Sequence, residues 1–483
     1  MTATRRKSAN VPRSAEIVDL SVKGSGSQPA EDLKPALEKT PPFRNTRSST
    51  KRPASFVGDG SDEPADTNNR SRNQRVKLED RPRTSGRMVE RPDANGIFRL
   101  KTAEFFDWMF ERHLLFLRRM EDPNPGKTKP WINNKLMLTM KSCNVFRELD
   151  YATQFLYQNI INNPQNDRSL ENLFFQVALF RGFSKPRTWI LLCEELERKK
   201  LGPPTTSLFQ SNFTDFVKAL ANIQTEGKKM KPKQALATGE YQIPSCRKEE
   251  KARGMSEGEA KLRNVQDLMR GRDKEVKEMD TKGKEAEGVP LWRRLERLSD
   301  AGMAFEETKK FNSYGDFMGY QLLLDFNYIK GFDFDFSSWV GSGPGSEAGL
   351  GLLFSKSHPA SNFDQMEALR LRSLSHWESI AKDHSKFSVS GSPLPDLAFG
   401  PDGLDGEITG PTLPGTSRGI GIVEIEHALC EFKKYEDARK SGTKKQLCAG
   451  RFLYKGIQSG IRKPVTLDLP AKYKLVGKSS VKP

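Results

Sequence analysis

The apolar residues of this chain recur at the spacing of helix turns in a series of separate segments, and each segment predicts a helix. In the first segment, 101–120, Phe105, Trp108 and Leu117 fall roughly on one helical face. Strand signals are scarce along the whole chain, so the pattern predicts an all-α fold. The predicted helical segments are 101–120, 134–160 (one helix or two), 170–183, 186–200, 211–224, 313–327 and 419–440.

Four stretches lack this periodicity. Residues 1–95, rich in Ser, Pro, Arg, Lys and Asp, are predicted to be a disordered tail. Residues 226–290 carry dense charge and few large apolar groups, which indicates an insertion that is either disordered or a solvated charged helix. A Pro-, Gly- and Ser-rich loop insertion covers 385–418, and the segment 441–483 is a basic, weakly structured tail. The helical domain is therefore divided over 97–225, 291–355 and 419–440, with the last long helix in the third part.

The amino-acid composition indicates what kind of partner the protein binds and in which compartment it works. Only 35% of the 483 residues are hydrophobic and 29% are charged, so part of the chain lacks a core. Lys plus Arg is 79 against 62 for Asp plus Glu, and the net charge of +17 favours a polyanion or an anionic surface. Five cysteines without a CxxC pair favour a reducing compartment and no zinc site. No apolar run reaches the roughly 18 residues of a membrane span, and the N-terminus lacks a secretory signal, so we expect no membrane association.

Two short basic clusters within residues 1–95 resemble nuclear-import signals. They are Lys51-Arg52-Pro53 and the sequence RVKLED at 75–80. The alternative is a solvated basic tail, because short basic clusters also arise by chance. The sequence predicts nuclear entry.

Several charged residues lie inside apolar helical segments. The arginines are Arg112, Arg118, Arg119, Arg147 and Arg181, and His113 follows the first of them. One interpretation is internal ion pairs, for which Glu111, Glu148 and Asp150 are candidate partners. The other is that several of these cations face a groove and contact phosphate, as a DNA-binding surface would.

Two glycine-containing motifs suggest phosphate binding. Gly126-Lys127-Thr128 lacks the preceding glycine of a nucleotide-binding loop, and flanking prolines forbid the helix that such a loop needs, so we exclude that reading. The segment Trp339–Ser346 contains Gly343-Pro344-Gly345 between two predicted helices, as in a helix-hairpin-helix element whose backbone approaches a DNA phosphate. The alternative is an ordinary glycine-rich helix connection, and Glu347 is unfavourable for phosphate.

The last predicted helix carries candidate acid–base residues. His427 and Glu431 are four residues apart and share a helical face, and Glu426 precedes the histidine. A carboxylate beside an imidazole can transfer protons. The alternative is a buried histidine held by a glutamate inside a helix bundle. No Ser/His/Asp arrangement and no set of metal ligands is visible in the sequence.

The order of the apolar blocks resembles a known family. The blocks are ERHLLFLRR (111–119), PW (130–131), NVFRELDYATQFLYQNI (144–160), LFRGFSKPRTW (179–189), GDFMGYQLLLDFNY (315–328), GSGPG (341–345) and IEHALCEFKKY (425–435). Together they resemble the helical domain of 5-hydroxymethyluracil DNA kinases, which is shared with the glutamyl/putrescinyl-thymine pyrophosphorylase group. The resemblance implies a fold like that of helix-hairpin-helix DNA glycosylases and a role in thymine hypermodification.

The resemblance also assigns roles to residues. It implies catalysis by His427, Glu431 and Glu426, and stacking of a flipped base on Trp131 or Tyr320. It implies DNA contacts by Arg112, His113, Arg118, Arg119, Asn144, Arg147, Gly343 and Gly345. The chain departs from the family pattern at three places, namely Ile132-Asn133-Asn134, Met140-Lys141-Ser142 and Lys433. At the position of Lys433 the family has an acid.

The function expected from the sequence is therefore recognition or processing of a modified thymine or cytosine in DNA. The alternative is a non-catalytic DNA-binding or chromatin interaction module that has kept the fold and lost activity. A chromatin scaffold that binds mainly through its basic tail is a third reading. The sequence identifies no cofactor and no protein partner.

Overall fold

Helices and short turns make up the part of the chain that the computed structural model describes, namely residues 92–122, 130–140, 142–231, 233–238, 254–276, 288–312, 314–389, 394–395, 410–440, 467 and 469. All of these residues belong to one structural unit, Thr84–Pro483. The basic clusters near positions 52 and 75, the Gly126–Thr128 motif and nearly all of 441–483 lie outside the described residues.

The expected all-α class is confirmed, because the described segments contain isolated β-bridges and no sheet. The elements are α1 (Arg99–Glu121), α2 (Lys135–Thr139), η1 (Arg147–Leu149), α3 (Tyr151–Leu156), η2 (Tyr157–Ile161), α4 (Leu170–Arg181), α5 (Pro186–Arg198), α6 (Thr206–Ser211), α7 (Phe213–Lys229), α9 (Glu257–Arg270), α11 (Leu291–Leu295), α12 (Ala301–Lys309), α13 (Asp316–Phe326), α14 (Pro344–Leu353), α15 (Asn362–Lys382), η3 (Ser385–Phe387) and α16 (Ile422–Lys440). None of the helices in these segments combines the length and the apolar character needed to cross a bilayer.

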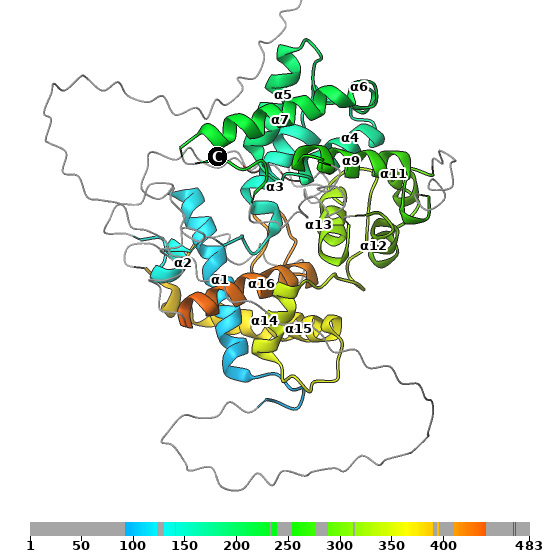
Figure 1. The fold of residues 1–483 in the computed structure, drawn as a ribbon. Coiled ribbons are helices and arrows are strands. Elements are labelled where there is room, and N and C mark those ends of the chain that lie inside the picture. Colours follow the sequence, from blue (N-terminus) through cyan, green and yellow to red (C-terminus); the bar gives the residue numbers. More distant parts are fainter. Residues whose placement is uncertain are drawn as a thin grey trace, which may run out of the picture. The chain divides into compact units, whose positions relative to one another are not determined.

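The first of two groups of helices joins the beginning and the end of the described chain. Helix α1 packs against α14, α15 and α16, which are two hundred or more residues later in the sequence (Figure 1). Phe105 of α1 meets Phe432 of α16 with ring centroids 5.3 Å apart. Phe106 meets Trp377 of α15 at 5.6 Å, and all four rings are buried. Aromatic burial of this size contributes several kcal/mol per ring, so α1 is held firmly on the C-terminal helices.

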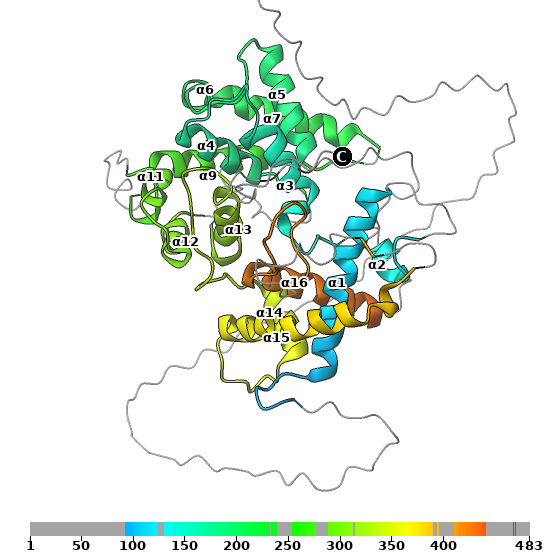
Figure 2. The same ribbon diagram turned by 180° about the vertical axis from the view of Figure 1, so that it is seen from behind.

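The second group contains α3 to α7, α9 and α11 to α13 (Figure 2). Its core is also aromatic. Phe174 of α4 stacks on Phe326 of α13 with ring centroids 4.2 Å apart, and Phe175 lies 4.9 Å from Phe209 of α6. The segment that precedes α3 runs between the two groups, and it carries the polar residues described below.

Glycines allow α14 and α16 to pack closely. A Cβ atom at Gly345 would collide with the side chain of Cys430, and one at Gly349 would collide with the backbone of Leu429. Gly343 is the N-cap of α14 and packs on Phe317. These glycines therefore serve helix–helix contact.

The sequence predicted a tight hairpin at Gly343-Pro344-Gly345, and the structure does not contain it. Helix α13 ends at Phe326 and α14 begins at Pro344, so a long connection separates them and the motif forms the N-terminus of α14. The side chain of Glu347 accepts a hydrogen bond from Ser342 at this helix end. An acidic side chain there disfavours a bound phosphate.

The expected charged insertion at 226–290 contains part of the core, which corrects the sequence interpretation. Helix α9 lies within it and packs on α7 and α4 through buried apolar residues, including Leu262, Val265 and Leu268. Helix α7 also continues to Lys229, beyond the expected boundary at 225. A few apolar residues at helical spacing make a buried face even where the average composition is strongly charged.

Helix α15 was not expected from the sequence. A capping box starts it, in which Ser361 accepts from the backbone of Asp364 and the Asp364 side chain accepts in return. The same pattern, a serine with an acid three residues later, begins α9 at Ser256 and Glu259. In the loop insertion, Thr412, Leu413 and Thr416 are buried, so the described end of 385–418 joins the core.

A buried acid, imidazole and thiol cluster as the candidate functional site

Asp150 is fixed by the turn that precedes it. The backbone N–H of Asn144 donates to its Oδ1 at 2.8 Å, and the Asn144 side chain donates to the same oxygen at 3.1 Å and to the carbonyl of Leu149 at 2.8 Å. Asp150 is also the N-cap of α3. Asn144, expected at DNA, instead holds the carboxylate in one orientation.

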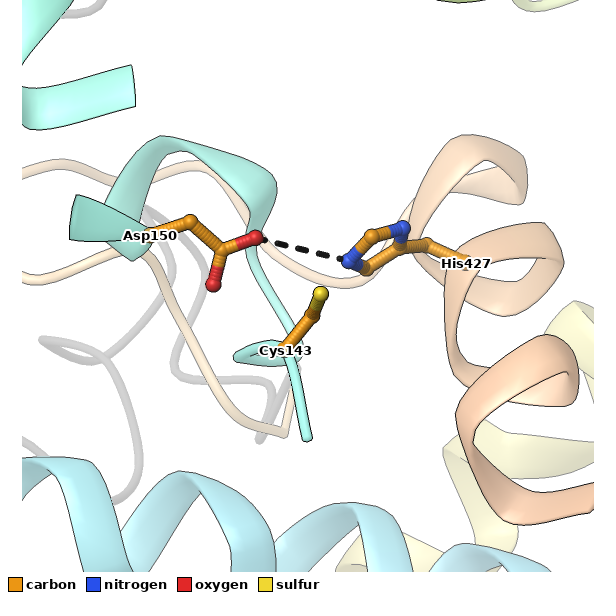
Figure 3. Close-up of side chains that lie close together, drawn as sticks. All are labelled: Cys143, Asp150 and His427. Atoms are coloured by element: carbon orange, nitrogen blue, oxygen red, sulfur yellow. Dashed lines mark ion pairs between the residues drawn. The ribbon is translucent and has the colours of Figure 1, made fainter. Parts of the chain in front are cut away.

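His427 of α16 faces this carboxylate. Its Nε2 lies 3.7 Å from Oδ2 of Asp150, which is an ion-pair distance rather than a hydrogen bond (Figure 3). Burial alone would lower the pKa of His427, but Asp150 and Glu431 outweigh burial and raise it. Burial likewise opposes ionisation of Asp150, yet His427, Asn144 and Arg112 together lower the pKa of its carboxyl. The ionised acid and the imidazole therefore stabilise each other.

Cys143 completes the group. Its sulfur, a carboxylate oxygen of Asp150 and a ring nitrogen of His427 all lie within 4.8 Å of one another (Figure 3). The backbone carbonyl of Cys143 accepts from Nε of Arg112 at 3.0 Å. We call Cys143, Asp150 and His427 the thiol–imidazole cluster.

Glu431 borders the thiol–imidazole cluster one turn along α16. Its Oε2 accepts from the backbone N–H of Cys143 at 3.3 Å, and its Oε1 lies 2.5 Å from Nζ of Lys434. Burial would lower the pKa of Lys434, but Glu431 and the thiols of Cys430 and Cys143 raise it. Lys434 is therefore charged beside the site. The expected shared face of His427 and Glu431 is present.

Glu426 lies beside His427, close to Arg147, Glu424, Val423 and Leu324. Burial raises the pKa of Glu426 despite nearby His427 and Ser346. Its neighbour Glu424 shares the guanidinium of Arg418 with Glu148, which is 2.5 Å from that group. The carboxyl group of Glu426 interacts with Ser346 and the backbone of Gly343, whereas that of Glu431 contacts Cys143 and Lys434, so the two acids have different neighbours.

Most of the cations expected at phosphate are internal, which corrects that interpretation. Arg112 donates to the backbone carbonyls of Ser142 and Cys143, and Arg118 donates to those of Trp131 and Phe387. Arg147 contacts Gln321 and Asp325. Arg112, Arg118, Arg147 and Arg181 expose 5% or less of their surface, so a DNA backbone cannot reach them in this conformation.

The two other expected DNA contacts on α1, His113 and Arg119, both pack against aromatic rings. His113 is 1% exposed and its ring meets Phe146 edge-on, and burial with the nearby Arg112 lowers its pKa to about 3. Arg119 is half-buried with its guanidinium 5.4 Å from the Trp131 ring centroid.

The two rings expected to stack on a base are buried instead. Trp131 donates from its indole N–H to the carbonyl of Asp122 at 2.7 Å and exposes 8%. Tyr320 exposes 1% and packs against Phe336, Trp339 and Gly341. Burial raises the pKa of the Tyr320 hydroxyl well above its usual value.

The sequence did not reveal the thiol–imidazole cluster, because Cys143 and His427 are far apart along the chain. The turn 144–150 and α16 bring them together across the two groups of helices. The only sequence signal was the helical spacing of His427 and Glu431, which identified one wall of the site.

The fold and the site define an all-helical domain with a buried set of acid, imidazole and thiol groups. The chain matches the helical domain of the 5-hmdU DNA kinase family over residues 101–398, and it belongs to that family. The family suggests a role in hydroxymethyluracil DNA modification. The match includes Cys143 and Asp150 and ends before α16. Neither the comparison with curated proteins nor that with solved structures gave a match.

Proposed function

We propose that this protein binds DNA and recognises or processes a hydroxymethylated pyrimidine at the site formed by Asp150, His427 and Glu431. The single observation that carries the proposal is the convergence of Asp150, inside the matched DNA-modification family domain, with His427 and Glu431 of α16, which follows that domain. A paired carboxylate and imidazole can exchange a proton with a hydroxymethyl group. The target base would be flipped out of duplex DNA, and the helices around the buried Asp150 and Glu431 would have to open to admit it. The expected likeness to DNA glycosylases remains part of this proposal.

The phosphate contacts come from a different surface than the sequence indicated. The C-terminal end of α7 carries exposed Lys228 and Lys229, and Lys231 and Lys233 follow in the turn after it. The N–H of Gln234 donates to the carbonyl of Gly227 at 2.8 Å, which folds this turn back on the helix end. We call these four lysines the basic turn. Exposed cations keep their counterions until DNA displaces them, so they suit phosphate binding.

The binding experiment compares two lysine sets. The variant Lys228→Ala/Lys231→Ala/Lys233→Ala should weaken DNA affinity about tenfold or more and flatten its dependence on salt between about 50 and 200 mM. The control is Lys309→Ala/Lys310→Ala, because these lysines of the α12 end pair with Glu306 and Glu307. Equal effects of both sets would remove the basic turn from the proposal. A fragment that starts at Thr84 and no longer binds would favour the scaffold reading.

The chemical experiment incubates DNA containing 5-hydroxymethyluracil with the protein and measures its nucleosides by mass spectrometry. Conversion should depend on Glu431, so that Glu431→Gln abolishes it while DNA affinity stays within about twofold. The control is Glu306→Gln, whose side chain is 67% exposed on α12. Selective binding of hydroxymethylated DNA without any conversion would support the non-catalytic module.

The location of the protein is a further part of the proposal. We propose that it enters the nucleus, on the basis of the basic clusters near positions 52 and 75. Deleting 1–91, which leaves all described helices in place, should move a fluorescent fusion to the cytoplasm. Unchanged nuclear accumulation would place the signal elsewhere.

A further inference from the structure

The thiol–imidazole cluster offers three kinds of ligand at one point. Cys143 supplies a sulfur, His427 a ring nitrogen and Asp150 a carboxylate oxygen, all mutually within 4.8 Å. Thiolate, imidazole and carboxylate are the three side-chain ligands that zinc takes in proteins. The members come from a turn and from a helix that are distant in sequence, so local chain geometry alone does not explain their convergence.

The orientation of the three groups differs from that of a nucleophile–base–acid triad. In a triad the two ring nitrogens face different partners. Here Nε2 of His427 faces Asp150, and Figure 3 shows the Cys143 sulfur on that same side of the ring. The groups therefore surround a common point, as metal ligands do.

Nε2 of His427 is a buried polar atom without a hydrogen-bond partner in the described structure. The carboxylate of Asp150 stabilises the ring electrostatically from 3.7 Å but does not accept a hydrogen bond from it, so a metal ion would supply the missing partner. Asn144 binds Oδ1 of Asp150 and so turns the other oxygen toward this nitrogen. At metal sites, residues behind the ligands hold them in orientation by hydrogen bonds to the ligand atom that does not face the metal. Asn144 has this position relative to Asp150.

Distances and charge agree with a divalent ion. Nitrogen and oxygen ligands of a tetrahedral zinc ion lie about 3.3 to 3.6 Å from each other, from metal–ligand lengths of about 2.0 to 2.2 Å. The Asp150–His427 separation of 3.7 Å is close to that value, and the Cys143 sulfur lies within 4.8 Å of both ligand atoms. A thiolate and a carboxylate together offset a charge of +2. Of the neighbouring cations, Lys434 is paired with Glu431, and Arg112 is held by backbone carbonyls of Ser142 and Cys143.

We propose that Cys143, Asp150 and His427 bind one divalent transition-metal ion of the zinc class. Three protein ligands leave one coordination position for water or for an oxygen atom of a substrate, which is the arrangement of catalytic rather than structural zinc sites. The proposal does not depend on DNA binding or on conversion of a modified base.

The first experiment titrates the metal-stripped, reduced full-length protein with Co²⁺ and then with Zn²⁺. We expect one equivalent of Co²⁺ to bind and to produce a thiolate-to-cobalt charge-transfer band, and Zn²⁺ to remove the band by displacement. Cys143→Ser should abolish the band, and His427→Gln and Asp150→Asn should each weaken binding at least tenfold. Absence of a thiolate band at saturating Co²⁺ would overturn the proposal.

The matched control is Cys430→Ser. Cys430 is also a half-buried cysteine beside the site, but its sulfur packs on Gly345 of α14. This variant should keep the band and the stoichiometry. If Cys430→Ser loses them and Cys143→Ser keeps them, the assignment of the ligand is wrong.

A second measurement needs no variant, so it covers the case in which Cys143→Ser fails to fold. In the wild-type protein, bound Zn²⁺ should slow alkylation of Cys143 at least tenfold, as followed by peptide mass spectrometry, while Cys193 of α5 is unaffected. Equal alkylation of Cys143 with and without Zn²⁺ would contradict the site. Both measurements are made without DNA, so a failure of the proposed function leaves their outcome unchanged.

Discussion

The guanidinium of Arg147 lies 2.9 Å from Oδ1 of Asp325, and both side chains are inside the protein. The other carboxylate oxygen of Asp325 binds Arg181 of α4. One acid on α13 therefore neutralises two buried arginines from different segments. Arg147 directly precedes Glu148 and lies three residues before Asp150, so this ion pair also anchors the turn that carries the candidate site.

Removing the shared acid should be severely destabilising. Asp325→Ala leaves two buried guanidinium groups without their carboxylate, and the free energy of unfolding should fall by about 3 to 5 kcal/mol. Urea denaturation followed by circular dichroism measures this loss. Glu306→Ala, at an exposed position of α12, should change the free energy of unfolding by less than about 0.5 kcal/mol. A similar small effect of Asp325→Ala would mean that the ion pair is not formed in solution.

Replacing two glycines of α14 by alanine should change the stability of the protein in opposite directions, because their surroundings differ. Gly349 lies against the backbone of Leu429 in α16, so Gly349→Ala should destabilise the protein by about 1 to 3 kcal/mol through overpacking. Gly351 has open space around its Cβ position on the same helix. Gly351→Ala should stabilise the protein by about 0.5 to 1 kcal/mol, because alanine favours the helix. Thermal denaturation of the two variants tests the pair, and a stabilising Gly349→Ala would contradict the close contact of α14 with α16.

His113 should make the protein sensitive to mild acid. Burial and Arg112 lower its pKa to about 3, below the unfolded value near 6.5. The unfolded chain therefore binds a proton first as the pH falls. The histidine's contribution to stability is complete above about pH 6.5 and declines between there and pH 3, by up to about 1.4 kcal/mol per pH unit.

The replacement His113→Leu measures how much His113 contributes to the pH dependence of the free energy of unfolding. Leucine keeps a similar volume, and neither ring nitrogen of His113 has a hydrogen-bond partner in the described structure. Between pH 6.5 and 4.5 the variant should lose less stability than the wild type, as measured by urea denaturation at each pH. Parallel pH profiles for the two proteins would show that His113 titrates normally.

Lys433, where the family has an acid, should not limit activity. Its ammonium pairs with Asp437 at 2.5 Å on the outer side of α16, whereas Glu431 and Lys434 border the thiol–imidazole cluster. Lys433→Asp should leave Co²⁺ binding and conversion of hydroxymethylated DNA within about twofold of the wild type. A gain of conversion in this variant would identify Lys433 as the cause of an impaired enzyme and would move the catalytic centre toward the outer face.

The sequence by itself determined the helical class, most of the long helices and the family. Apolar residues at helical spacing mark α1, α4, α5, α7, α13 and α16 whatever their neighbours are, because one buried face is a local property. The capping signals at Ser256 and Ser361 could also have located α9 and α15, where average composition concealed a short apolar face.

Only the tertiary structure decided what the polar residues do. A sequence cannot tell a buried arginine from one at a groove, because that depends on which distant group lies opposite. Arg147 forms an internal ion pair because Asp325 lies opposite it. Arg112 is internal because the backbone carbonyls of Ser142 and Cys143 accept its hydrogen bonds. Likewise Cys143 was one of five scattered cysteines until the packing of α16 placed His427 beside it. Helical periodicity is encoded within a few turns of chain, whereas a site made of groups almost three hundred residues apart exists only once the two groups of helices have packed together.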